Sequence, residues 1–266
     1  MRIFDTHAHY DDDAFDEDRE TLIPQIHEGG IEYIVNVGAS IETTRSTLAL
    51  ASKYDYIYAA VGVHPSDIKD LNEETYKWLA EQTKQPGVVA VGEIGLDYYW
   101  DKEPEVQENQ RTWFRRQLDM ARKANLPVII HSREAAKDTY DIMVEEKAGD
   151  IGGVVHCYSY SKEMALDYVK MGFFIGVGGV VTFPKAKKLK ETVEAVPMEH
   201  IVIETDCPYL APNPYRGKRN TSLNLPYVIA EIASIKGLSE EEVAEIVYDN
   251  ALKLYRMTGG RSFCQL

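Results

Sequence analysis

The sequence contains few cysteines, no long apolar run and no apolar leader. Its 266 residues include only three cysteines, Cys157, Cys207 and Cys264. This odd and sparse number argues against a disulfide framework. The segment that follows Met1 has no apolar core, and no run of about 18 apolar residues occurs, so we expect neither a signal peptide nor a membrane-spanning helix. These absences favour a protein of the reducing cytoplasm.

Positive charge is also scarce. Lysine and arginine number 29 against 43 aspartates and glutamates, which gives a formal net charge of −14. Such a surface argues against tight, non-specific binding along a nucleic-acid backbone, because that binding needs many basic contacts. It leaves a nucleic-acid substrate open, since bound metal ions bring local positive charge that the count omits.

The chain lacks a linker rich in proline, glycine or serine, a fixed-period repeat and a low-complexity tract. Short apolar segments alternate instead with longer stretches of helical periodicity. Several short segments are almost continuously apolar, which is typical of strands buried on both faces of a parallel sheet. Eight segments are predicted as strands: Arg2–His7, Glu32–Gly38, Ile57–His64, Val88–Glu93, Pro127–His131, Gly152–His156, Gly172–Gly178 and Ile201–Asp206.

Eight alternations of strand and helix favour a closed (β/α)8 barrel over an open, doubly wound sheet. We therefore predict one α/β domain of the TIM-barrel type over residues 1–258 and a short C-terminal tail over residues 259–266. A capping box of Ser239 and Glu242 predicts the start of the last helix. One helical face is marked by the spacing of Trp113, Phe114, Leu118 and Ala121.

Seven side chains of metal-binding type stand at the C-terminal ends of the predicted strands or just beyond them. Active-site residues of a (β/α)8 barrel come from those ends, so we expect the seven at one rim. Each alone has an ordinary explanation, such as a structural hydrogen bond, a helix cap or a buried ion pair. Five of the seven histidines share this placement, however, which chance does not explain. The set is His7, His9, His64, Glu93, His131, His156 and Asp206.

The first of these ends carries a His-x-His pair. Side chains alternate along a strand, so His7 and His9 share a face and together can bind one divalent ion. Asp5 falls on the same face, either as a partner for an imidazole N–H or as a buried structural hydrogen bonder. Glu204 precedes Asp206 by two positions on the last predicted strand, so it falls on the same face as Asp206 and the same two alternatives apply to it.

Two groups of ligands with a carboxylate between them predict a pair of metal ions. A bridging Glu93 would hold ions about 3.5–4 Å apart. One ion then lowers the pKa of a water molecule while the other polarises the electrophilic oxygen. Asp206 is placed to take the proton from the nucleophile, so Glu93 and Asp206 are the predicted catalytic residues. The chemistry is hydrolysis, and it leaves phosphoesters, amides and esters open.

At these residues the chain resembles the TatD family of metal-dependent deoxyribonucleases, within the amidohydrolase-like superfamily. A His-x-His pair alone is a weak signal, whereas six blocks in the same order are a strong one. The matching stretches are Phe4–His9 (FDTHAH), Ala60–Pro65 (AVGVHP), Gly92–Asp97 (GEIGLD), Leu126–Arg133 (LPVIIHSR), Val155–Ser159 (VHCYS) and Glu204–Leu210 (ETDCPYL).

The resemblance implies two metal ions and a nuclease. One ion would be bound by His7, His9 and Asp206 and the other by His131 and His156, with Glu93 shared. The implied reaction is hydrolysis of DNA phosphodiester bonds, often as a 3′–5′ exonuclease on single strands, with magnesium or manganese. Zinc also suits a mixed histidine and carboxylate site. Single-stranded DNA is then the expected partner, and neither a membrane nor a stable protein partner is implied.

Two residues near the ligands are predicted to bind substrate. Arg133 follows His131 by two positions and is expected to hold a phosphate oxygen. Its alternative is a surface ion pair with Glu134 or Asp138. His64 is expected at the rim, where it would give a hydrogen bond to the substrate rather than bind a metal ion.

The segment Tyr215–Asn220 is basic in an otherwise acidic protein. It suits either contact with a phosphate backbone or a solvated loop. Family members often continue with an acidic residue and a proline, whereas this chain continues with Thr221–Leu223. Four residues next to the motifs are expected to pack rather than react. Tyr158 and Tyr209 could stack on a base or form pocket walls, and the second is favoured. Cys157 and Cys207 are expected as buried side chains.

Other functions fit the same residues. A hydrolase of small substrates, such as a lactonase, an amidohydrolase or a phosphotriesterase, would use the same metal site, because function lies in the loops. An open channel lined by arginine and tyrosine would favour the nuclease. A closed apolar pocket would favour the hydrolase of small substrates. A non-catalytic binding module is disfavoured by the complete ligand set.

Overall fold

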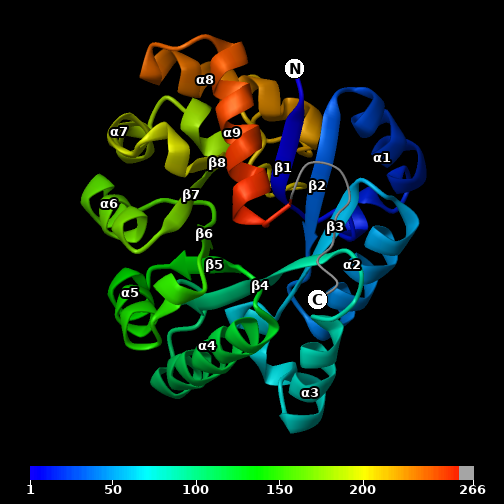
Figure 1. The fold of residues 1–266 in the computed structure, drawn as a ribbon, viewed down its shortest axis with the longest axis vertical. Coiled ribbons are helices and arrows are strands. Elements are labelled where there is room, and N and C mark those ends of the chain that lie inside the picture. Colours follow the sequence, from blue (N-terminus) through cyan, green and yellow to red (C-terminus); the bar gives the residue numbers. More distant parts are fainter. Residues whose placement is uncertain (258–266) are drawn as a thin grey trace.

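A computed structural model describes residues 1–257 as a nearly closed barrel of eight parallel strands (Figure 1). The strands are hydrogen-bonded in chain order, from the first to the eighth. They are β1 (Ile3–Ala8), β2 (Ile31–Val37), β3 (Ile57–Val61), β4 (Val88–Asp97), β5 (Val128–Arg133), β6 (Gly153–Val155), β7 (Phe173–Val177) and β8 (Ile201–Ile203). The predicted (β/α)8 barrel is confirmed.

Helices surround the strands on the outside of the ring, except for the last helix, which lies across its middle (Figure 1). The α-helices are α1 (Arg19–Glu28), α2 (Ile41–Lys53), α3 (Glu73–Gln82), α4 (Pro104–Ala124), α5 (Ala136–Glu145), α6 (Lys162–Lys170), α7 (Lys187–Ala195), α8 (Leu225–Lys236) and α9 (Glu240–Leu254). Short 3-10 helices are η1 (Asp13–Phe15), η2 (Pro65–Asp70), η3 (Ala148–Asp150), η4 (Gly179–Thr182), η5 (Met198–His200) and η6 (Ser222–Asn224). Within residues 1–257, no helix has both the length and the apolar character to cross a membrane.

The predicted elements are found, with differences at their ends. The capping box of Ser239 and Glu242 starts α9. β4 continues past Glu93 because it pairs with β5 as far as Asp97. β3 stops at Val61, three residues before His64, which instead caps η2. The predicted tail, residues 259–266, lies outside the described residues.

Apolar side chains form two layers, one on each side of the strand ring. In the outer layer, Phe114 and Leu118 of α4 pack with strand residues such as Ile94. The inner layer takes side chains from around the ring, among them Ile129 and Val154. These two residues precede His131 and His156 by two positions, so the same inward face carries the ligands.

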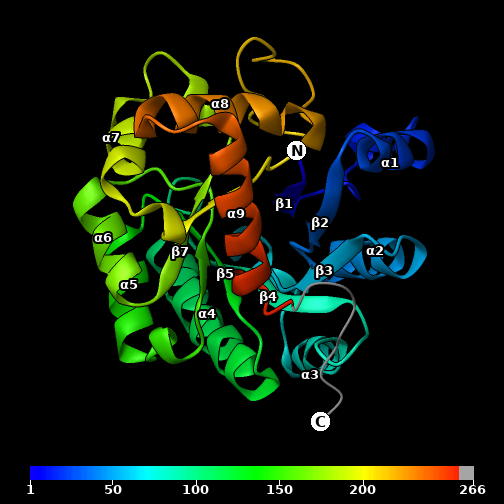
Figure 2. The same cartoon turned by 45° about the horizontal axis from the view of Figure 1, so that its top comes forward.

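Helix α9 closes the inner layer from one end. Tyr248, Ala251 and Leu254 belong to the same buried cluster as the inward-facing strand residues. The helix accordingly lies across the middle of the ring in Figure 1 and in the tilted view of Figure 2. The hydroxyl of Tyr255 donates a hydrogen bond to the backbone oxygen of Thr6 at 2.6 Å. The interior is therefore a packed core, and the ligands lie above it.

β1 and β8 meet through the segments that follow them. An isolated parallel bridge joins Ala8 to Cys207. The N–H of Asp206 donates to the oxygen of His7, and the N–H of His9 donates to the oxygen of Cys207, both at 2.9 Å. The closing hydrogen bonds of the barrel therefore lie between ligand-bearing segments.

The glycines at the start of β6 give a test of the close strand packing. A Cβ at Gly153 would lie 2.1 Å from the carbonyl oxygen of Val128 on β5, whereas a Cβ at Gly152 would meet nothing within 4 Å. We expect Gly153→Ala to lower the free energy of unfolding by about 3 kcal/mol, because β5 must shift. Gly152→Ala, at φ +74°, should cost only about 1 kcal/mol.

Urea unfolding of the metal-free variants measures both values. Equal losses of stability in the two variants would contradict the packing argument.

Candidate metal centre

Glu93 lies at the centre of the predicted ligand set. Its side chain is buried on β4, and its two carboxylate oxygens face different histidines. Oε2 lies 3.4 Å from His7 Nε2 and 3.8 Å from His9 Nε2. Oε1 lies 2.6 Å from His131 Nδ1 and 2.8 Å from His156 Nε2. One carboxylate thus faces two separate pairs of imidazoles, as a bridging ligand requires.

The first group consists of His7, His9, Asp206 and Glu93. The Nε2 atoms of His7 and His9 lie 3.0 Å apart. Asp206 Oδ1 lies 3.7 Å from the first and 3.5 Å from the second. These donor atoms surround one point, so the structure brings together the residues expected to bind one ion.

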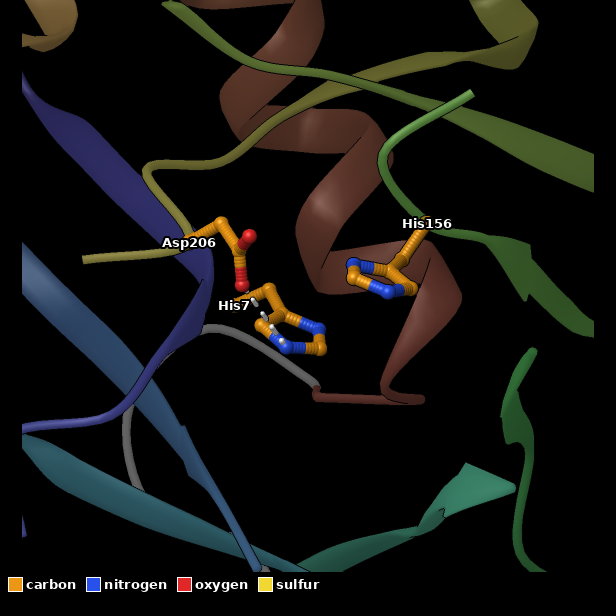
Figure 3. Close-up of side chains that lie close together, drawn as sticks. All are labelled: His7, His156 and Asp206. Atoms are coloured by element: carbon orange, nitrogen blue, oxygen red, sulfur yellow. Dashed lines mark ion pairs between the residues drawn. The ribbon is translucent and has the colours of Figure 1, made fainter. Parts of the chain in front are cut away.

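The second group consists of Glu93, His131 and His156. His131 Nδ1 and His156 Nε2 lie 3.3 Å apart, and both face the same oxygen of Glu93. The rings of His7 and His156 stack with their centroids 4.1 Å apart, so the two groups touch (Figure 3). His7, His156 and Asp206 also lie close enough to share an ion.

The hydrogen bonds of the imidazoles show which ring nitrogens are available to a metal. His9 Nδ1 lies 2.9 Å from the carbonyl oxygen of Val37, to which it donates, so its Nε2 lone pair faces the centre. His131 Nε2 lies 3.2 Å from Asp97 Oδ2, which leaves Nδ1 toward Glu93. These two imidazoles therefore present nitrogen donors to the centre, and a divalent ion fits the residues present.

His64 has the opposite orientation. Its Nδ1 accepts a hydrogen bond from the N–H of Ser66 at 3.2 Å, so the neutral ring carries its hydrogen on Nε2. That nitrogen lies 3.7 Å from Glu93 Oε1, and His64 also lies near Asp97 and His131. Burial lowers the pKa of His64 to about 3, with a further contribution from His131. His64 is thus a neutral donor at the rim, consistent with the predicted contact to substrate.

Burial and charge act against each other throughout the centre. Burial alone would raise the pKa of Glu93, but the charge of His156 and hydrogen bonds from the imidazoles hold it well below its usual range. Burial would lower the pKa of His9, whereas the hydrogen bond and charge of Asp206 raise it to about 9. The pKa of His156 likewise rises to about 10, mainly through Glu93. Burial lowers that of His7 to about 4.

The metal-ligand groups open into a cavity of about 850 Å³. Except for His7, which is fully buried, the predicted site residues all line it. Arg133 lies on its wall, with the guanidinium 4.1 Å from the centre of the Tyr99 ring. The alternative ion pair with Asp138 does not form, because that carboxylate instead accepts hydrogen bonds from Tyr98 and Arg111.

Asp97 is a site residue that the sequence analysis did not single out. It is 1% exposed, and its Oδ2 faces His131 Nε2. A carboxylate on the outer nitrogen of a ligand histidine fixes its orientation and tautomer. The available signal was its position in the GEIGLD motif, four residues after Glu93, which would have placed Asp97 near the rim if the predicted strand had been extended beyond Glu93.

Asp5 and Glu204 do not act on imidazole N–H groups. Asp5 accepts hydrogen bonds from the N–H of Thr205 at 3.0 Å and from the hydroxyl of Ser222 at 2.6 Å. The β1–β2 register is irregular between Asp5 and Ala8, so strict alternation of side chains fails there. Asp5 is thus the structural hydrogen bonder of the two alternatives.

Glu204 accepts from the backbone N–H of Cys157. Its carboxylate lies 3.8 Å from His156 Nδ1, which is too far for a hydrogen bond. Glu204 therefore stabilises the segment that carries His156 through a hydrogen bond from the backbone of Cys157, and not through the imidazole of His156.

The basic segment Tyr215–Asn220 does not reach the cavity. Arg219 is paired with Asp18, and Arg216 lies over the ring of Phe183. Asn220 is buried and donates to the oxygen of Thr205 at 2.9 Å. None of the residues of this segment lines the cavity, so the segment does not contribute a phosphate contact beside the metal-ligand groups.

The four packing predictions hold in part. Cys207 is buried as expected. Tyr158 is also buried but does not line the cavity, so its prediction as a pocket wall is wrong. Tyr209 lines the cavity as expected. Cys157 is only half-buried and lines the cavity as well, because its backbone has φ +44° where a regular strand would turn the side chain away. Burial raises the pKa of its thiol well above the usual range, so it is a poor nucleophile.

Comparison with known proteins agrees with this geometry. Residues 4–256 match the family described as TatD related DNase. The chain belongs to the TatD family. An uncharacterized metal-dependent hydrolase of Bacillus subtilis, YabD, is 44% identical over 255 residues, which cover 96% of this chain and 99% of that protein. YcfH of Escherichia coli, also an uncharacterized metal-dependent hydrolase, is 34% identical over 98% of each chain.

Solved structures of TatD proteins share the fold. YjjV, a TatD homolog from Escherichia coli, superimposes with a TM-score of 0.89 at 31% identity and covers 96% of this chain and 98% of its own. A TatD family hydrolase from Entamoeba histolytica gives 0.85 at 25% identity, with 97% and 99% covered. The strands that carry Glu93 and the histidines thus belong to a barrel common to TatD proteins.

Metal binding should release protons. In the metal-free protein His9 and His156, with pKa values of about 9 and about 10, hold protons at neutral pH and lose them only as the pH rises through those values. An ion needs the neutral rings, so the apparent affinity for Mn²⁺ should increase with pH between about pH 6 and about pH 8.

Calorimetry in two buffers of different ionisation enthalpy measures the released protons. An affinity that is constant over this range, without proton release, would contradict the assignment.

Asp97→Asn should weaken metal binding by about 10- to 100-fold, because His131 loses the carboxylate that orients it. The matched control is Asp101→Asn, since Asp101 accepts from Gln110 and Ser66 and does not face a ligand. Titration with Mn²⁺, followed by calorimetry, compares the two. The same affinity in both variants would show that His131 is oriented without Asp97.

Proposed function

We propose that this TatD protein is a metal-dependent deoxyribonuclease that hydrolyses phosphodiester bonds of single-stranded DNA. The observation that carries the proposal is the carboxylate of Glu93, whose two oxygens face two separate groups of imidazoles. His7, His9 and Asp206 would hold one divalent ion with Glu93. His131 and His156 would hold a second one, again together with Glu93.

The bound ions would supply Lewis acidity, which acidifies water and polarises a phosphoryl oxygen. The protein residues bind, orient and move protons around them. Asp206 lies at the open side of the centre with its pKa held below the usual range by His9 and His156 against the effect of burial. It is the proton acceptor for the attacking nucleophile. The Nε2–H of His64 donates a hydrogen bond to the substrate, and Arg133 holds a phosphate oxygen.

Membership of a family described as DNases supports a DNA substrate. Magnesium or manganese are the expected ions, and zinc also suits the donor set. A 3′–5′ exonuclease is the expected mode of attack. A hydrolase of a small substrate is the second candidate, because a cavity of about 850 Å³ is within the usual size for a small ligand.

Glu93→Ala should abolish hydrolysis of single-stranded DNA, by about 10³-fold or more, because both ions lose a ligand. The fold should survive, since the strands do not depend on this side chain. Release of nucleotides with Mg²⁺ or Mn²⁺ is measured before and after chelation, and circular dichroism monitors the fold. Glu105→Ala, at an exposed position on α4, is the control.

Wild-type rates in the Glu93 variant would refute the bridging role. A wild-type protein that turns over a lactone but no DNA, with either ion, would favour the small-substrate hydrolase.

A further inference from the structure

The turn after β4 exposes two aromatic side chains beside the cavity. Trp100 is 66% exposed and Tyr99 is 44% exposed. By contrast, Trp113 is buried at 8%. Trp100 lines the cavity together with Arg133. Large apolar side chains exposed side by side are typical of interaction sites and ligand-binding grooves.

Arg133 is stacked on this turn. Its guanidinium carbon lies 4.1 Å from the centre of the Tyr99 ring and 5.5 Å from that of Trp100. The two rings meet edge to face with centroids 4.8 Å apart. Among the ion pairs of residues 1–257, none involves Arg133. Stacking thus holds the guanidinium in place while its N–H groups stay available to an anion.

The charge of the cavity limits what it can bind. Its acidic lining residues are Asp11, Asp12, Asp67, Glu93, Asp97 and Asp206. Against them, Arg133 is the only arginine or lysine among the described lining residues. A groove that follows a nucleic-acid backbone carries many cations. A single arginine beside the centre instead suits one phosphate.

Asp97 fixes the turn relative to the metal ligands. Its Oδ1 accepts hydrogen bonds from the N–H of Tyr99 at 2.9 Å and of Trp100 at 3.1 Å. Its Oδ2 faces His131. The backbone that carries the aromatic rings is therefore held by the same carboxylate that orients a ligand.

We propose that Trp100 and Arg133 form a subsite for a single nucleotide next to the scissile bond. The base stacks on Trp100, and Arg133 binds the phosphate of the same nucleotide. A base paired in a duplex is already stacked, so this subsite selects an unpaired nucleotide at or near a strand end. The inference rests on the proposed nuclease function and names the residues that select its substrate.

The test compares single-stranded oligonucleotides that contain one abasic position, moved stepwise from the end, with the intact strand. Trp100→Ala should raise KM for the intact strand by roughly 5- to 150-fold, the usual range for one stacked base, with a smaller change in kcat. For the strand that is abasic at the subsite, wild type and Trp100→Ala should have the same KM. Trp100→Phe should restore most of the affinity.

Two further variants complete the test. Tyr227→Ala removes another exposed aromatic side chain, 39% exposed on α8 and outside the cavity lining, and should leave KM unchanged. Arg133→Gln should reduce the slope of log KM against log salt concentration by about 0.7, the value for one phosphate of a single strand.

The failures are distinguishable. If the wild type cleaves the intact and abasic strands with equal KM, or if Trp100→Ala leaves KM unchanged, the subsite is refuted and the nuclease stands. If the wild type cleaves neither strand with Mg²⁺ or Mn²⁺, the proposed function is refuted, and the subsite with it.

Discussion

The metal centre depends on how the barrel closes. The N–H of Asp206 donates to His7, and the N–H of His9 donates to Cys207, so the backbones of three ligands are held by the hydrogen bonds that join the first and last strands. Asp5 reinforces this seam through Thr205. Any slip of β8 against β1 would separate Asp206 from the two histidines, and the packed interior opposes such a slip.

The second constraint is the charge on Glu93. A buried carboxylate is costly unless it is paired and hydrogen-bonded, and here imidazoles surround it. Without metal, protons on His9 and His156 balance the charges of Glu93 and Asp206, and bound metal would take that role. Protons and ions therefore compete for one set of atoms. Because protonated imidazoles already balance the two carboxylates, the centre is neutralised without a lysine or arginine side chain.

The ring of strands and the ligand set could be predicted because both depend on local pattern. Apolar runs mark strands, and the ends of parallel strands meet at one rim, which brought His131 and Glu93 together. Contacts between distant segments could not be predicted in this way. The irregularity of β1 at Asp5, the pairing of Arg219 with Asp18 and the stacking of Arg133 on Tyr99 depend on register and on loop paths. Neither alternation nor spacing encodes these features.

Asp97 links the candidate metal ligands to the turn that carries the proposed nucleotide subsite. One of its oxygens faces His131, and the other holds the turn that carries Trp100. If metal binds at His131 and a nucleotide binds at Trp100 as proposed, the free energies of the two binding events would be coupled through Asp97, and such coupling is reciprocal. If bound metal raises the affinity for a nucleotide by some factor, the bound nucleotide raises the affinity for metal by the same factor. If the protein acts as we propose, bound metal would therefore dissociate more slowly while a nucleotide occupies the subsite than when the subsite is empty.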